Sequence, residues 1–122
     1  MCAIDSAADA VVGFVCGTLT RADELTAVAL ATHEADGTTL CVHSVCVDAS
    51  WRRRGVASAL LRVYLATVAG GAPRVRMLRL LAKPYLTELY TRASFTLLGP
   101  SAVQHGAEQW LDFCRPLAPR ET

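Results

Sequence analysis

One stretch of the chain, residues 38–69, constrains the fold more than any other. An apolar run, TTLCVHSVCV, is followed by a polar turn and then by a segment whose apolar residues recur at helical spacing. The run is rich in β-branched residues and predicts a buried strand over 38–47, while the spacing predicts a helix over 55–69 that a Gly-Gly-Ala-Pro sequence ends. Strand, turn and helix in this order are typical of an α/β domain.

The other apolar segments predict a mixed β-sheet flanked by helices, an α/β (α+β) arrangement in the order β-β-α-β-α-β-β. The 122 residues suffice for a single domain over 1–122 with one core. We expect a short lead-in over residues 1–9, a parallel crossover through 38–81, and a break at Gly99–Pro100 between the last two strands. The predicted elements are strands over 11–19, 38–47, 74–81, 95–98 and 107–113, a helical turn within 24–31, and helices over 55–69 and 84–93.

The strand over 38–47 changes its alternation part-way. Leu40 and Val42 define one face, whereas Val45 and Val47 are apolar in the opposite phase. An extra residue near Ser44 explains the change, so we predict a β-bulge there. A strand buried on both faces would tolerate the same pattern.

The turn that follows has the sequence Asp-Ala-Ser-Trp-Arg-Arg-Arg-Gly-Val-Ala-Ser over 48–58, with the spacing Arg-x-x-Gly-x-Ala. A helix N-terminus exposes unpaired N–H groups and the positive end of the helix dipole, and both suit a phosphate. Gly55 and Ala57 keep the backbone clear for a bulky ligand, and the arginines add positive charge. The turn therefore predicts a phosphate site formed by Arg52, Arg53, Arg54, Gly55, Val56, Ala57 and Ser58.

Two other interpretations of the three arginines stay open, a solvated surface and a nucleic-acid contact. The net charge is +1, 52% of the residues are hydrophobic, and Trp51 is the only aromatic residue near the arginines. We therefore expect no nucleic-acid partner. The turn also lacks the Gly-Lys-Ser/Thr of a P-loop and the third glycine of a dinucleotide site.

Together, the strand, bulge, turn and helix resemble the acetyl-CoA-binding core of the GNAT superfamily of N-acetyltransferases. Within it the chain is most similar to the arylalkylamine (serotonin) N-acetyltransferases, over about residues 11–117. The matching residues are Gly13-Phe14, Gly17-Thr18-Leu19, Leu25-Thr26, His43, Arg52, Gly55, Leu60-Leu61, Tyr64-Leu65, Tyr90, Ser94-Phe95 and Gly99-Pro100.

The resemblance implies a function, transfer of acetyl from acetyl-CoA to a primary amine, such as an arylalkylamine, by direct attack. It implies that Tyr90 protonates the departing thiolate and that His43 passes the amine proton away through water. A core tyrosine and a structural histidine are the alternatives, and Tyr85 is a rival to Tyr90. Cys41 stands where the family has a second histidine, and a thiol is a poor replacement in a proton path.

The resemblance also implies that the backbone of Val45, Cys46 and Val47 pairs with the pantetheine arm and polarises the thioester carbonyl. The loop over 104–109 matches the family's border of the acceptor pocket, where we expect Trp110 to belong to the core. The phosphate turn would then bind the pyrophosphate of acetyl-CoA.

The family has a strand, two helices and another strand ahead of the strand over 11–19, and about ten residues stand in their place. We therefore expect an N-terminally shortened fold, with a homo-oligomer covering the exposed sheet edge. The alternative function is a module that binds acetyl-CoA with little or no catalysis, because the acceptor half is missing.

The five cysteines, an odd number, predict buried free thiols in a reducing compartment rather than disulfides. Cys41, His43 and Cys46 also suggest a metal site, but on an extended strand Cys46 faces away from the other two and a fourth ligand is not evident, so we expect no metal. Asp5 and Asp9 lie where a signal peptide would have a positively charged segment and an apolar core. No apolar run is as long as a membrane span. We therefore expect a cytoplasmic protein with no membrane partner.

Overall fold

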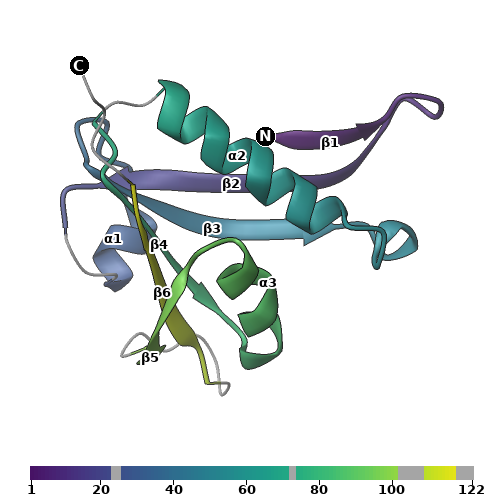
Figure 1. Cartoon of the computed structure of the whole chain (residues 1–122). Coiled ribbons are helices and arrows are strands. Elements are labelled where there is room, and N and C mark those ends of the chain that lie inside the picture. Colours follow the sequence, from purple (N-terminus) through teal and green to yellow (C-terminus); the bar gives the residue numbers. More distant parts are fainter. Residues whose placement is uncertain (23–25, 72–73, 102–108, 118–122) are drawn as a thin grey trace.

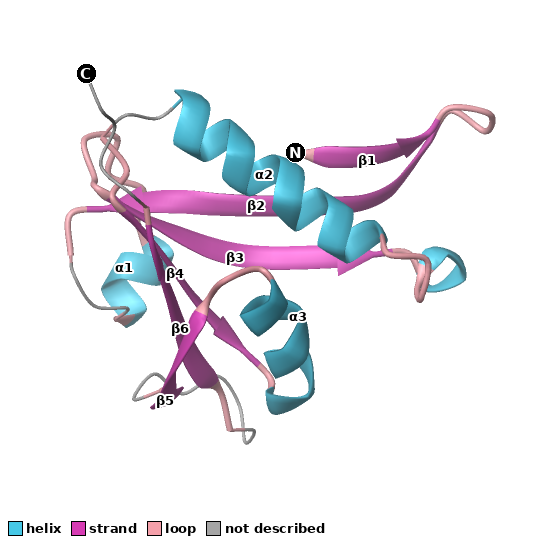
Figure 2. Cartoon of the chain, viewed as in Figure 1, coloured by secondary structure: helices cyan, strands magenta, loops and turns pink. Residues whose placement is uncertain are grey.

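The computed structural model describes residues 1–22, 26–71, 74–101 and 109–117, and of Ala27 only the backbone. The strands of these residues form one sheet in the order β1-β2-β3-β4-β6-β5 (Figure 1). The elements are β1 (Cys2–Asp5), β2 (Ala10–Thr20), α1 (Ala27–Ala31), β3 (Thr39–Val47), η1 (Ala49–Trp51), α2 (Val56–Gly71), β4 (Met77–Ala82), η2 (Pro84–Leu86), α3 (Thr87–Arg92), β5 (Thr96–Pro100) and β6 (Leu111–Pro116) (Figure 2).

The sheet is mixed, as the sequence predicts. β3 and β4 are parallel neighbours joined through α2, whereas the pairs β1–β2, β2–β3, β4–β6 and β5–β6 are antiparallel. The predicted β-bulge is confirmed, one residue before its expected place. Cys16 is opposite Ser44 and Gly17 is opposite Val42, so His43 is the extra residue of β3.

The structure corrects two predictions about elements. The lead-in over 1–9 contains β1, which pairs with β2, and the Met1 ammonium donates to the Val15 carbonyl at 2.9 Å. The strand has only four residues, Cys-Ala-Ile-Asp, and their apolar and polar side chains do not alternate clearly, so its periodic signal was too weak to recognise. Gly99 and Pro100 do not separate the last two strands, because both lie within β5. Proline is tolerated there because β5 is an edge strand.

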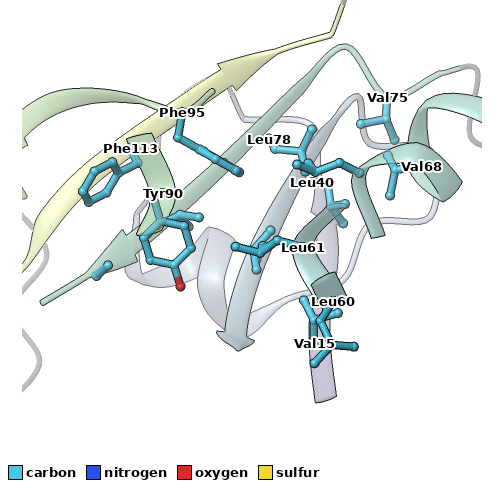
Figure 3. Packing of buried hydrophobic residues seen from close by; sticks show 14 residues of the cluster. Val15, Leu40, Leu60, Leu61, Val68, Val75, Leu78, Tyr90, Phe95 and Phe113 are labelled. Carbon is cyan, nitrogen blue, oxygen red and sulfur yellow. The ribbon is translucent and has the colours of Figure 1, made fainter. Parts of the chain in front are cut away.

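The core lies between the sheet and the two helices α2 and α3 (Figure 3). Its members come from every central strand and from both helices, so α2 and α3 are held on one face of the sheet. The fully buried side chains at its centre include Val15, Leu61, Leu78, Leu80 and Phe113.

Gly17 allows α2 to lie close to the sheet. A Cβ atom at Gly17 would lie 2.6 Å from the Cys41 carbonyl oxygen and 3.0 Å from the Tyr64 hydroxyl of α2. The first distance is shorter than real Cβ contacts and the second is tight, so a side chain at Gly17 would press on the β3 backbone and on the end of the Tyr64 side chain.

The cysteine prediction is partly wrong. All five cysteines are free, but only Cys41 is buried, Cys114 is half-buried, and Cys2, Cys16 and Cys46 are exposed. These three cysteines lie on β1, β2 and β3, at positions of the strands that are exposed to solvent.

Candidate functional site

The turn between β3 and α2 forms a hollow of about 230 Å³. It is lined almost entirely by residues that the sequence predicts as phosphate ligands. These are Arg52, Arg53, Gly55, Val56, Ala57 and Ser58, with Val47 and Trp51. The hollow therefore opens on the N-terminus of α2.

The backbone of this turn has a conformation that suits an anion. Arg53 has a φ of 63° and Gly55 a φ of 77°, and such turns gather successive N–H groups into an anion-binding concavity. The first helical hydrogen bond runs from the Ala59 N–H to the Gly55 carbonyl at 3.0 Å, so the N–H groups of 56–58 precede it. No atom lies within 4 Å of a Cβ built on Gly55, which leaves room for a ligand against the backbone.

The three arginines of the turn differ in what they contact. Arg52 Nε donates to the Val47 carbonyl at 3.2 Å, which ties the turn to the end of β3. The guanidinium of Arg54 lies over the Trp51 ring, 4.7 Å from its centroid. Arg53 is exposed at the mouth of the hollow. The arginines hold the turn and also make its surface positive.

β3 and β4 separate just before this turn. Their paired residues run from Thr39 with Met77 to Val42 with Leu80, and the pairing stops at the bulge residue His43. Figure 1 shows the two strands diverging beyond that point. The β4-facing backbone groups over 44–47 are therefore without a strand partner in the described sheet, in the segment predicted to hold an extended ligand arm. Val45 packs against the core and Cys46 is exposed.

Tyr90 lies on α3 with its ring buried and its hydroxyl directed away from the neighbouring aromatic rings. The ring packs against Phe95 and Phe113, with centroids 5.8 Å and 5.5 Å away. Figure 3 shows the hydroxyl pointing away from both rings. Every fully buried side-chain oxygen of the described residues has a hydrogen-bond partner, and none is found for this hydroxyl, so its oxygen keeps some accessible surface although Tyr90 as a whole is buried.

Burial raises the pKa of Tyr90 to about 12, with smaller contributions from Cys46 and Tyr85. The phenol is therefore protonated throughout the neutral range and is a proton donor, not a base. The rival Tyr85 is 78% exposed and lies on η2, away from the core. The structure thus separates the two tyrosines sharply.

His43 lies at the bulge with its ring exposed. Its Nε2 atom is 2.6 Å from the Thr18 hydroxyl on β2, a hydrogen bond that fixes the ring. Cys41, two residues earlier, is buried, and burial raises the pKa of its thiol to about 11. The thiol therefore stays protonated and does not replace a second histidine as a proton acceptor.

A second hollow, of about 390 Å³, opens beside His43. Its walls are mostly apolar and come from α1 and three strands or their ends: Leu30, Val42, His43, Ser44, Leu81 and Trp110. Trp110 is half-buried and has the Lys83 ammonium 5.8 Å from its ring centroid. The expectation that Trp110 belongs to the core is wrong, because it lies at the edge of this hollow instead. Residues 104–108 of the predicted pocket border lie outside the described residues.

Within the described part of the chain, no group of three or more histidine, cysteine or acidic side chains is placed to bind a metal ion. None of the helices described is long and apolar enough to cross a membrane.

Comparison with known proteins decides the family. The family model for the Acetyltransferase (GNAT) family matches residues 2–95. This chain belongs to the GNAT acetyltransferase family. It is 32% identical over 101 residues to serotonin N-acetyltransferase of Mesocricetus auratus, which covers 83% of this chain and 48% of that protein. The chain thus spans about half the length of this curated relative.

Solved GNAT structures share the fold at low sequence identity. NAA60 of Arabidopsis thaliana, in complex with a bisubstrate analogue, has a TM-score of 0.68 and 20% identity, covering 93% of this chain and 70% of that one. An aminoglycoside 6'-N-acetyltransferase complexed with coenzyme A has a TM-score of 0.67 and 14% identity, covering 99% and 73%. These likenesses establish the GNAT architecture of the sheet and helices.

Several residues near the site were not identified as site residues from the sequence. Thr18 was recognised only as part of the family pattern, and its contact with His43 depends on the register slip between β2 and β3. Leu30 and Leu81 are ordinary apolar residues whose place beside His43 follows from the packing of α1 and β4. No signal in the sequence distinguishes them from core residues.

Proposed function

We propose that this chain is an acetyl-CoA-dependent N-acetyltransferase that acetylates a primary amine by direct attack on the thioester. One observation carries the proposal. The unpaired backbone of β3 over 44–47 runs from His43 directly into the hollow at the N-terminus of α2. A long ligand with an extended arm and a pyrophosphate matches that combination of surfaces.

The donor half of the site consists of backbone and arginines. The N–H groups at the start of α2 and the turn arginines bind the pyrophosphate, and Val45, Cys46 and Val47 offer backbone groups to the pantetheine arm. In the reaction, the amine nitrogen bonds to the carbonyl carbon and the carbon–sulfur bond breaks. Coenzyme A then leaves as a thiol.

Two side chains move the protons of this reaction. His43 accepts the amine proton, directly or through water, with its ring held by Thr18. Tyr90 donates its phenolic proton to the sulfur as the thiolate forms, and its raised pKa keeps that proton in place until then. We propose no metal in this chemistry.

The acceptor belongs, in this proposal, to the arylalkylamines. The hollow beside His43 has apolar walls that include Trp110, and no acidic or basic side chain other than His43 lines its described part. An aromatic ring with a short alkylamine arm fits such walls and brings its nitrogen to the histidine. The relative named serotonin N-acetyltransferase supports the same class.

The test is a free-thiol assay with acetyl-CoA across tryptamine, phenylethylamine, a polyamine and a peptide amine. We expect turnover with the first two, and a drop of about a hundredfold for His43→Gln, since general base catalysis contributes on that order. Turnover only with the polyamine or peptide amine would overturn the acceptor class. Acetyl-CoA binding without turnover of any amine would favour the alternative, a binding module with an incomplete acceptor half.

We also propose self-association, a cytoplasmic location, and no nucleic-acid or membrane partner. The support for self-association is the edge strand β1 and the exposed apolar residues beside it, Ile4, Val11 and Phe14. Size-exclusion chromatography with light scattering tests it, and a monomer at micromolar concentration contradicts it.

A further inference from the structure

A groove of about 630 Å³ lies between α2 and α3 and continues from the hollow at the turn. The two share Gly55 and Ser58. The groove is lined by Gly55, Ser58, Ala59, Arg62, Leu65, Ala66, Ala69, Leu89, Arg92, Ala93, Ser94 and Arg115. The hollow and the groove therefore adjoin at the start of α2.

Among the described residues that line this groove, the charged ones are all arginines. They come from α2, α3 and β6, and none of the described lining residues is acidic. Arg115 is half-buried and its Nε donates to the Ala93 carbonyl at 3.1 Å, so it lies at the base. Arg62 is exposed and has no ion-pair partner among the described residues, while Arg92 is exposed and pairs with Glu88 one turn earlier. The groove is thus complementary to an anion.

The spacing along α2 places Arg62 close to the turn. Ser58, Arg62, Ala66 and Ala69 recur every three or four residues and line the same groove. At 1.5 Å rise per residue, Arg62 lies roughly 6 Å farther along the axis than Ser58. The alanines on either side leave room beside the guanidinium.

We propose that Arg62 and Arg92 bind the 3′-phosphate of coenzyme A and select it over 3′-dephospho-coenzyme A. The inference rests on the proposed donor site at the turn. The 3′-phosphate is one ribose ring away from the pyrophosphate, and one helical turn separates Arg62 from Ser58. On binding, Arg92 would leave its exposed ion pair with Glu88, which contributes little stability. Its guanidinium would instead donate two parallel hydrogen bonds to the phosphate.

Calorimetric titration of the full chain with coenzyme A and with 3′-dephospho-coenzyme A tests the proposal. We expect wild type to bind coenzyme A about tenfold more tightly, as one charge-assisted phosphate contact provides. The double variant Arg62→Ala/Arg92→Ala is expected to bind both ligands equally, at the wild-type affinity for the dephospho form. Because both side chains are exposed, the variant keeps its fold, which its melting temperature verifies.

The matched control is Arg74→Ala/Arg76→Ala, which removes the same charge at two exposed arginines outside the groove. It is expected to keep the tenfold preference. Equal binding of both ligands by wild type, or an equal preference in the double variant and wild type, overturns the 3′-phosphate assignment alone. Failure of wild type to bind either ligand overturns the donor site as well.

Discussion

The Thr18 hydroxyl lies 2.6 Å from Nε2 of His43, next to the point where the β2–β3 register slips by one residue. The slip leaves His43 without an opposite residue on β2, and its ring turns to the neighbouring threonine. The same slip coincides with the end of β3–β4 pairing. One extra residue in β3 therefore both orients the proposed base and opens the strand edge proposed to hold the donor.

Removing the Thr18 hydroxyl is expected to slow acetyl transfer without weakening the donor. We predict that Thr18→Val lowers kcat about threefold to tenfold, because His43 loses the hydrogen bond that fixes its ring, worth about 1 kcal/mol. KM for acetyl-CoA is expected to stay the same, and Thr18→Ser is expected to restore kcat. Nitrogen NMR of the His43 ring reports the tautomer directly, and an unchanged spectrum in Thr18→Val contradicts the positioning role. Thr67→Val on the exposed side of α2 is the control.

Replacing Tyr90 by phenylalanine removes the proton donor and keeps the packing. The ring contacts with Phe95 and Phe113 remain, so the melting temperature is expected to change little. We predict a fall in kcat of about a hundredfold. The matched control Tyr85→Phe alters an exposed tyrosine and is expected to leave kcat unchanged. Full activity of Tyr90→Phe would remove the acid assignment and leave the donor site standing.

The raised pKa of Tyr90 also predicts an alkaline effect on stability. The phenol keeps its proton to about pH 12 in the folded chain, whereas in the unfolded chain it loses it near pH 10. Above pH 10 the unfolded state binds fewer protons, so the free energy of unfolding falls with rising pH and the contribution is lost by about pH 12. Urea unfolding at a series of pH values measures this. Tyr90→Phe should show a shallower alkaline decline than wild type, and parallel curves would contradict a raised pKa of Tyr90.

Gly17 is predicted to be intolerant of any side chain. Gly17→Ala places a Cβ atom 2.6 Å from the Cys41 carbonyl oxygen, so we expect a loss of about 1–3 kcal/mol in the free energy of unfolding. Gly70→Ala is the contrasting variant, since no atom lies within 4 Å of its Cβ in α2. It is expected to stabilise the chain by about 0.5–1 kcal/mol, as alanine does within a helix. Equal effects of the two substitutions in urea unfolding would contradict the close contact between Gly17 and the β3 backbone.

Much of the fold and part of the site were predictable from local patterns. The strand over 38–47, the helix that follows it and the phosphate turn have strong sequence signals, and their periodicity identified the bulge within one residue. β1 was missed because four residues with weak alternation give little periodic information. Its strand character comes from pairing with β2, which is a tertiary effect.

The acceptor hollow and the arginine groove could not be predicted in the same way. Leu30, Leu81 and Trp110 are far apart in the sequence and meet only through the packing of α1, β4 and β6. The sequence does not distinguish Arg62 from other exposed helix arginines, because its place in the groove depends on how α3 packs relative to α2. Cys2, Cys16 and Cys46 were predicted to be buried but are exposed, because apolar neighbours in the sequence do not show which face of the sheet is left uncovered.

The central claim is that the N-terminus of α2 binds acetyl-CoA, and Ser58→Glu tests it most directly. A carboxylate in the first turn favours the helix dipole and so preserves or raises the melting temperature of the free chain, yet it places a negative charge in the hollow meant for the pyrophosphate. Thr67→Glu, exposed and outside both the hollow and the groove, introduces the same charge as the control. In thermal melts across an acetyl-CoA series, wild type and Thr67→Glu are predicted to gain stability with ligand concentration by mass action, while Ser58→Glu gains none. Absence of any acetyl-CoA stabilisation in wild type, or full stabilisation of Ser58→Glu, would contradict the account.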